Sequence, residues 1–279
     1  MTSPTATTPA PGADDRTVSM APRADCIADS AGGLTFDVSD HGAPEPAHLV
    51  LMNRASGEET RLPLTPVGDG RLRASLPISV GLPEGRWDVY VQVAADEPVR
   101  LMPGTNDLRL LVDRAPSGSR GYVAVRIPYA TKHGNLTVRS WLRAPHAEAG
   151  ELLIEKGELT VGGRLYGTRF SAKAAVEIRS RATAGQILHG ELDVDGDLFA
   201  LRIGYDELSD GRWDVWLRPD GADGPEVRVA RLLDDVADKK PIFTYPGTLV
   251  TVPGRRELLA EPYYTRDNDL AIVVATVDA

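Results

Sequence analysis

Short runs in which apolar and polar residues alternate recur along most of this chain. In the run GRWDVYV at 85–91, the period of two places Trp87, Val89 and Val91 on one face of a strand and Asp88 and Tyr90 on the other. Many such runs, separated by turn signals roughly every 8–12 residues, are typical of an immunoglobulin-like sandwich with about seven strands per domain. The pattern therefore predicts an all-β chain.

An internal repeat organises these runs. The segment GRWDVYV at 85–91 returns as GRWDVWL at 211–217, displaced by 126 residues. A second segment, PYATKHGNL at 128–136, returns as PYYTRDNDL at 262–270, displaced by 134 residues. Two motifs in the same order indicate an internal duplication. Each second motif reads as a β-hairpin turn between two apolar strands.

The repeat predicts two tandem immunoglobulin-like β-sandwich domains, at residues 31–143 and 151–279. The first 30 residues are rich in Thr, Pro, Ala and Ser, and we interpret them as a disordered tail. The small residues and single proline of 144–150 predict a linker.

The apolar residues of the segment 227–237 fit two different secondary-structure patterns. Residues 227–229 alternate as a strand does, whereas the apolar positions between 229 and 237 fall at helical spacing. We expect a strand that is followed by one helical turn.

Composition narrows the functional classes. The net charge of −9 argues against a nucleic-acid binder and against docking on an anionic membrane. No run reaches the roughly 18 apolar residues of a transmembrane helix, so we expect no membrane insertion. The N-terminus lacks the basic and apolar regions of a secretory signal, and we expect a cytoplasmic protein.

The Ala-, Arg-, Gly- and Asp-rich amino-acid usage of the chain resembles that of actinobacterial proteins. We interpret Cys26, the single cysteine, as a surface thiol.

Signs of metal or catalytic chemistry are sparse. Asp193, Asp195 and Asp197 stand at alternate positions, as carboxylates do in calcium loops. The equivalent first-half segment, 67–71, is a plain Asp-Gly hairpin turn, which favours a turn in both halves. No histidine stands at a metal-ligand spacing from another ligand, and nucleophile-elbow, Walker and dinucleotide motifs do not occur. We predict no metal, no cofactor and no identifiable catalytic residue.

The densest polar chemistry lies in the two repeated hairpin turns, and loops at one end of a sandwich often bind ligands. The alternative is that Asn, Asp and Gly simply satisfy the backbone of a tight turn. Trp87 and Trp213 are expected in the core, whereas Trp216 points to the opposite face, where it either contacts a glycan or partner or packs under a loop or against the other domain. The second turn has an additional aromatic residue and is the stronger candidate. The candidate binding residues are Tyr129, Lys132, His133, Trp216, Tyr263, Tyr264, Arg266, Asp267 and Asn268.

The repeated pattern Pro-Tyr-x-Thr-x-x-Gly/Asn-Asn/Asp-Leu, at 128–136 and 262–270, resembles modules of actinobacterial proteins linked to cell-envelope glycopolymer assembly. In those proteins, similar β-rich segments follow glycosyltransferase or glycerophosphotransferase domains. The tandem arrangement is also similar to the immunoglobulin-like C-terminal modules of wall-teichoic-acid glycosyltransferases. This chain has no transferase domain, so the resemblance implies an accessory role.

Two functional hypotheses follow. The first is a non-catalytic binding or assembly module that recognises a glycan or docks a partner glycosyltransferase, with a duplicated surface suited to bivalent contact. The second is an enzyme of small-molecule or envelope-sugar metabolism, with its site in a cleft between the sandwiches. Residues outside the repeat, such as His189, Tyr205 and Asp206, would line that cleft. The sequence leaves the oligomeric state open.

Overall fold

The structure is a computed structural model that describes residues 21–39, 46–112, 114–116, 121–251, 253 and 257–277. Strands dominate this part of the chain, which contains two 3₁₀ turns, η1 (Arg109–Leu111) and η3 (Gly221–Asp223), and no α-helix. The all-β prediction is confirmed. The described residues also contain no helix with the length and hydrophobicity that a membrane span requires.

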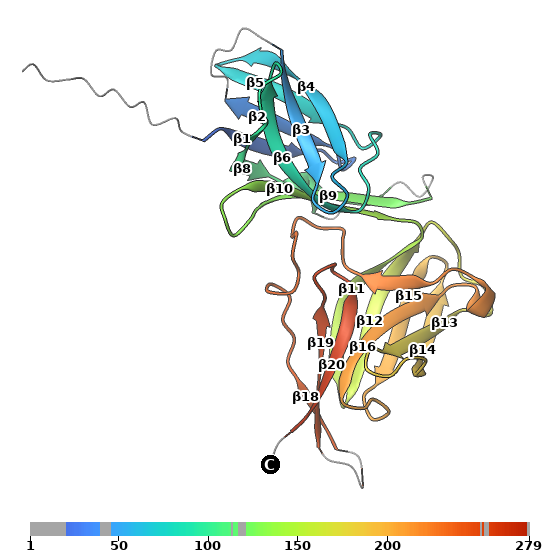
Figure 1. The fold of residues 1–279 in the computed structure, drawn as a ribbon. Helices are drawn as coiled ribbons and strands as arrows, with labels where there is room; N and C mark the ends of the chain where they lie inside the picture. The colour runs from blue at the N-terminus through green and yellow to red at the C-terminus, as the bar shows by residue number, and fades with distance from the viewer. Residues whose placement is uncertain are drawn as a thin grey trace, which may run out of the picture.

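The described residues of the first half form one sheet of ten strands, coloured blue to green in Figure 1. Its main path runs β8-β1-β2-β5-β4-β3-β6-β10-β9, and β7 pairs with β6. The strands are β1 (Arg23–Ala28), β2 (Leu34–Ser39), β3 (Ala47–Asn53), β4 (Glu59–Gly68), β5 (Arg71–Leu76), β6 (Gly85–Val93), β7 (Val99–Arg100), β8 (Met102–Asp107), β9 (Val123–Ala130) and β10 (Leu136–Arg143).

In the second half, the part that the structure describes forms another sheet of ten strands, in the order β13-β14-β15-β12-β11-β17-β16-β20-β19-β18. Because β13 also pairs with β16, part of this sheet closes on itself. The strands are β11 (His146–Glu155), β12 (Glu158–Tyr166), β13 (Ala175–Ser180), β14 (Ile187–Asp195), β15 (Leu198–Gly204), β16 (Gly211–Arg218), β17 (Val227–Ala230), β18 (Thr248–Val250), β19 (Leu258–Tyr264) and β20 (Leu270–Thr276).

The repeated strands β6 and β16 bury the face that their alternation predicts. Trp87 and Trp213 are both fully buried, each in its own hydrophobic core. Their indole Nε1 atoms donate to the carbonyl oxygens of Pro83 at 3.0 Å and Ser209 at 2.9 Å, each four residues earlier in the chain. The hydrogen bonds satisfy the only polar atom of each indole, which lowers the cost of burying it.

Part of the predicted disordered tail forms a strand, while residues 1–20 of that tail lie outside the described residues. β1 lies within residues 1–30, and it pairs with β2 and β8. Cys26 on this strand is fully buried, so its interpretation as a surface thiol is wrong. Burial raises the pKa of the Cys26 thiol to about 12. The strand escaped prediction because its core-facing residues, Ala24, Cys26 and Ala28, are too small to give a strong hydrophobic pattern.

The predicted linker is also shorter than expected. β10 ends at Arg143 and β11 begins at His146, so only Ala144 and Pro145 join the two sheets. The Ala144–Pro145 peptide bond is cis. Residues 146–150, which were expected in the linker, belong to β11, and residues 146–149 pair with β12.

The ambiguous segment contains the predicted strand, β17, but not the predicted helical turn. After Ala230 the chain leaves the second sheet, and Leu232 enters the core of the first half. The backbone amides of Leu232 and Leu233 donate to the Glu148 carboxylate at 2.9–3.0 Å, which fixes an irregular path. The helical spacing thus reflects apolar residues that dock on another part of the molecule.

Candidate functional site: two matched pockets

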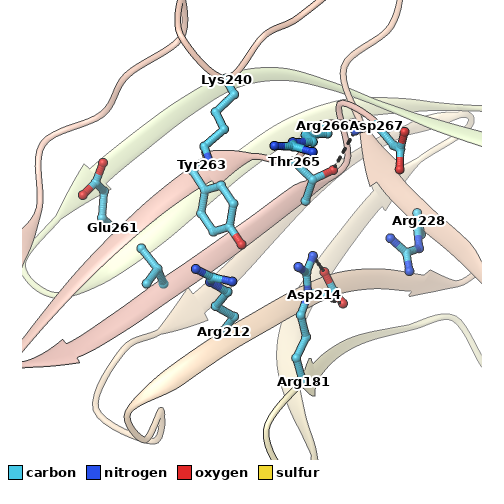
Figure 2. Close-up of a pocket in the computed structure, with 11 residues that line it drawn as sticks. Arg181, Arg212, Asp214, Arg228, Lys240, Glu261, Tyr263, Thr265, Arg266 and Asp267 are labelled. Atoms are coloured by element: carbon cyan, nitrogen blue, oxygen red, sulfur yellow. Dashed lines mark hydrogen bonds and ion pairs between the residues drawn. The ribbon is translucent and has the colours of Figure 1, made fainter. Parts of the chain in front are cut away.

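A pocket of about 730 Å³ lies on the outer face of the second sheet, and we call it the C-terminal pocket. Figure 2 shows the Tyr263 hydroxyl pointing toward the guanidinium groups of Arg212 and Arg181. The lining residues are Arg181, Arg212, Asp214, Arg228, Lys240, Glu261, Tyr263, Thr265, Arg266, Asp267 and Val273.

Strand alternation explains why these side chains meet. Trp213 and Val215 face the core, so Asp214 between them faces outward. In the same way Tyr263 lies between the buried residues Pro262 and Tyr264. Ala271 of β20 pairs with both Asp214 and Tyr263. This pairing places Asp214 and Tyr263 on either side of the same position of β20.

Asp214 is held by Arg181, whose Nε and Nη2 atoms donate to its two carboxylate oxygens at 2.9 and 2.5 Å. The hydrogen bonds to Asp214 raise the pKa of Arg181. The paired arginine fixes the carboxylate in one orientation, as bidentate pairs do.

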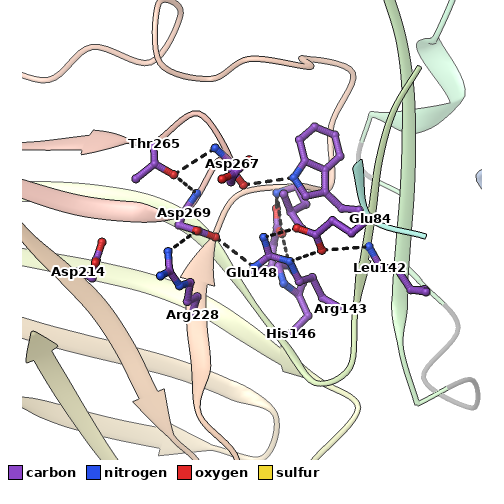
Figure 3. Close-up of polar contacts among 12 residues, drawn as sticks. Glu84, Leu142, Arg143, His146, Glu148, Asp214, Arg228, Thr265, Asp267 and Asp269 are labelled. Atoms are coloured by element: carbon purple, nitrogen blue, oxygen red, sulfur yellow. Dashed lines mark hydrogen bonds and ion pairs between the residues drawn. The ribbon is translucent and has the colours of Figure 1, made fainter. Parts of the chain in front are cut away.

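A second carboxylate connects this pocket to the first half of the chain (Figure 3). Asp269, which is 5% exposed, accepts from Arg228 at 2.7 Å and from Arg143 at 3.1 Å. Next to it, Asp267 accepts from Arg139 through its side chain at 2.7 Å and from the Trp141 indole through its backbone at 3.2 Å. One wall of the pocket is therefore part of the junction between the halves.

A pocket of about 700 Å³ lies on the outer face of the first sheet, and we call it the N-terminal pocket. Its lining residues are Arg54, Asp88, Tyr90, Arg100, Tyr129, Thr131, Lys132, His133 and Asn135.

The two pockets are built from residues at matching positions of matching strands. Asp88 pairs with Thr137 as Asp214 pairs with Ala271, and Tyr90 pairs with Arg100 as Trp216 pairs with Arg228. The backbone amides of Arg54 and Arg181 donate to the carbonyls of Arg86 and Arg212, at 2.9 and 2.8 Å. The matched lining pairs are Arg54 and Arg181, Asp88 and Asp214, Arg100 and Arg228, Tyr129 and Tyr263, Thr131 and Thr265, Lys132 and Arg266, and His133 and Asp267.

Asp88 is the centre of the polar network in the N-terminal pocket. Its carboxylate accepts from Arg54 at 2.6 Å, from Arg100 at 2.7 Å and from the Thr137 hydroxyl at 3.0 Å. Burial opposes ionisation of Asp88, but these hydrogen bonds outweigh it and lower the pKa. The carboxylate is therefore ionised and held in place at neutral pH.

The turns beside the two pockets have the same backbone geometry. Thr131 Oγ1 accepts from the amides of His133 and Asn135, and Thr265 Oγ1 accepts from those of Asp267 and Asp269. The fourth turn residue has a left-handed φ in each case, 74° at Gly134 and 61° at Asn268. Glycine and asparagine tolerate this conformation best, which explains the Gly/Asn position of the repeated pattern.

Six of the nine candidate binding residues lie in the pockets. They are Tyr129, Lys132 and His133 in the N-terminal pocket, and Tyr263, Arg266 and Asp267 in the C-terminal pocket.

The other three candidates have different surroundings. Tyr264 is fully buried in the second core against Phe243 and Tyr245, and burial raises the pKa of its hydroxyl. Asn268 is also buried, and its side chain accepts from the backbone of Lys239 at 3.1 Å. The expectation that these two side chains form a contact surface is wrong, because the second turn is packed under the 231–243 segment.

Trp216 is half-buried and does not line the C-terminal pocket. The guanidinium carbons of Arg179 and Arg228, from the two neighbouring strands, each lie 4.6 Å from its ring centroid. These cation–π contacts occupy the ring surface that a ligand would need.

Sequence reasoning missed the arginines that pair with carboxylates at the pockets, which are Arg54, Arg100, Arg181 and Arg228. A signal for them exists: Val99-Arg100-Leu101 returns as Val227-Arg228-Val229, displaced by 128 residues. Arg54 and Arg181 are displaced by 127 residues, close to the spacing of the GRWDV repeat. Both signals are too short to stand out before the strand pairing is known.

The residues proposed for an interdomain catalytic cleft lie elsewhere. His189 and Asp206 line a pocket of about 220 Å³ within the second half, and Tyr205 is fully buried in the second core. The carboxylates of Asp193 and Asp197 pair with Arg202 at 3.0 Å and with Arg164 at 2.7 Å. Among the described residues, no group of three His, Cys, Asp or Glu side chains is arranged to hold a metal ion.

Comparisons with known proteins assign no family to the chain. No protein-family model matches it, and no curated protein matches it. Residues 217–571 of S. aureus TarS are 14% identical with a TM-score of 0.33, covering 65% of this chain and 55% of that one. A longer S. aureus TarS structure is 13% identical with a TM-score of 0.32, covering 69% of this chain and 38% of that one.

A pullulanase from Anoxybacillus sp. LM18-11, complexed with maltotriose, is 10% identical with a TM-score of 0.27. The match covers 70% of this chain and 24% of the pullulanase. At TM-scores below 0.5, none of these similarities assigns an activity. The function is therefore argued from the two pockets.

Proposed function

We propose that this chain is a non-catalytic accessory module that binds a glycan through its two pockets. The observation that carries the proposal is the matched set of an aspartate, two arginines and a tyrosine in each pocket. In this proposal the two halves are immunoglobulin-like domains that arose by duplication, and their shared pocket is the feature that both retained. The module would act beside a glycosyltransferase in cell-envelope or sugar metabolism.

The residue types in each pocket match the chemistry of a sugar. A sugar presents hydroxyl groups that both donate and accept hydrogen bonds, and apolar C–H faces that pack on aromatic rings. Asp88 and Asp214 supply fixed acceptors, and their neighbouring arginines supply donors. Tyr129 and Tyr263 are half-buried beside them and present ring surface to the pocket.

Two pockets on one chain suit a polymeric ligand. When one pocket holds a glycan, the second pocket meets the same chain at a raised effective concentration, provided that the polymer spans both sites. Weak single-site binding then becomes tight binding to the polymer. A short oligosaccharide gains no such advantage.

A glycan array followed by calorimetry tests the proposal. We expect the full chain to bind a polymeric glycan, and Tyr129→Ala and Tyr263→Ala each to weaken binding at least about tenfold through loss of one site. The double variant should lose binding while its melting temperature remains close to that of the parent chain. Glu155→Gln, at the exposed β11–β12 turn, is the control and should bind normally. If no glycan binds, or if the double variant binds as well as the parent, the proposal is wrong.

A further inference from the structure

The balance of charge in the pockets differs from that of the whole chain. The protein has a net charge of −9. The C-terminal pocket is nevertheless lined by five Lys or Arg residues and three carboxylates. The N-terminal pocket is lined by three Lys or Arg residues and one carboxylate, together with His133. Both pockets therefore have an excess of positive charge on an acidic protein.

Some of these cations have no carboxylate partner. Arg212 and Arg266 are exposed at the C-terminal pocket and form no ion pair within the described residues. Both line the same pocket as Tyr263 (Figure 2). The Lys240 amine lies 5.6 Å from the centroid of that ring. The free guanidinium groups present donors in the fork geometry that recognises carboxylate and phosphate oxygens.

The N-terminal pocket also has an excess of positive charge, but different residues provide it. Arg54 and Arg100 share the single carboxylate of Asp88, so the three groups together retain one positive charge. Lys132, at the matching position to Arg266, is exposed and forms no ion pair in the described part of the chain. The same charge excess therefore occurs in both halves although the individual residues differ.

We infer that the ligand of these pockets is an anionic glycan, in which a sugar ring packs on Tyr129 or Tyr263 and its phosphate or carboxylate group binds the neighbouring unpaired cations. The inference rests on the proposed function and names the class of its ligand. Phosphate and carboxylate offer the same paired oxygen acceptors to a guanidinium group. The excess of cations selects against a neutral glycan, because a neutral ligand leaves the mutual repulsion of the cations in place.

Calorimetry on the full chain with four probes tests the inference: dextran, phosphorylated dextran, polygalacturonate and a single-stranded DNA oligonucleotide. We expect at least about tenfold tighter binding of a charged glycan than of dextran, with an affinity that falls as salt is raised. A preference for phosphorylated dextran or for polygalacturonate identifies phosphate or carboxylate as the recognised group. Equal or tighter binding of the oligonucleotide would overturn the assignment to a glycan.

Variants that each remove one positive charge test which residues cause the preference for a charged glycan. Arg212→Gln, Arg266→Gln and Lys132→Gln should each weaken binding of the charged glycan severalfold and reduce its dependence on salt. Arg169→Gln removes the same charge at an exposed residue outside both pockets, and it should bind as the parent does. If dextran binds as tightly as the charged polymers and the three pocket variants have no effect, the inference fails while the proposed function stands. If no polymer binds, both fail.

Discussion

The two repeated turns share a backbone conformation but have different surroundings. The first, at 131–135, is an exposed edge of the N-terminal pocket. The second, at 265–269, borders the C-terminal pocket and also joins the halves, because Asp267 and Asp269 accept from three side chains of β10 (Figure 3). Its Asn268 is covered by the segment that follows β17.

This difference shows which parts of the repeat serve a common role and which serve the junction. The threonine that organises the turn and the tyrosine that enters the pocket occur in both halves. Of the residues that change, Asp267 and Asp269 in the second turn accept from β10 across the junction, whereas their counterparts His133 and Asn135 lie in the first half itself. The shared threonine and tyrosine therefore belong to the pockets, and the two aspartates that only the second turn has form the junction.

The largest expected effect on stability tests the similarity of the two hydrophobic cores. Trp87→Ala and Trp213→Ala should each lower the free energy of unfolding by about 3–5 kcal/mol, because each empties the centre of a core. Chemical denaturation monitored by circular dichroism measures both losses. A loss at one position that is less than about half the other would show that the two cores do not depend on their tryptophans in the same way.

The next largest effect on stability tests the difference between the two repeated turns. Asp269→Ala should cost about 2–3 kcal/mol, because it leaves Arg143 and Arg228 without their shared carboxylate in a site where Asp269 is 5% exposed. The matched change Asn135→Ala should cost no more than about 0.5 kcal/mol, since Asn135 contributes only its backbone to the turn. Thermal melting of both variants gives the comparison, and equal losses would contradict a special role for the second turn.

A smaller effect depends on pH. The hydrogen bonds from Arg54, Arg100 and Thr137 hold the pKa of Asp88 below its ordinary value of 3.8 despite partial burial. A lowered pKa in the folded state means that this stabilisation is complete above the unfolded pKa and is lost as the pH falls through the folded pKa. Asp88→Asn should therefore cost about 1–2 kcal/mol at pH 7 and progressively less below about pH 4. Melting curves from pH 2 to 7 measure this, and a loss that does not change with pH would disprove it.

The sequence predicted those features that depend on local pattern. Alternation in GRWDV placed Trp87 and Trp213 in the cores and their aspartates on the outer faces, as the structure confirms. The repeated hairpin pattern located the turns and six pocket residues. Such features follow from strand periodicity and turn chemistry, which act over a few residues.

What the sequence did not predict depends on contacts between distant residues. Tyr264 looked like an additional surface aromatic because its counterpart in the first turn is Ala130, and turn geometry alone does not demand an aromatic residue at this position. The burial of Tyr264 comes from Phe243 and Tyr245, which belong to the segment that crosses to the junction. Leu232 likewise packs in the core of the other half. No local pattern reveals which remote segment will cover a given face.

The smallest expected effect on stability gives the sharpest test of the two turns as binding surfaces. Lys132→Ser and Arg266→Ser replace exposed side chains that form no ion pair among the described residues, so each should change the free energy of unfolding by no more than about 0.5 kcal/mol. Because the first turn stands apart from the junction and the second is fixed by it, any loss of glycan binding with unchanged melting reports on the pocket alone. Calorimetry and thermal melting on the same samples separate the two quantities. Lost stability in the Lys132 variant would show that the first turn has a structural role that its exposure does not reveal.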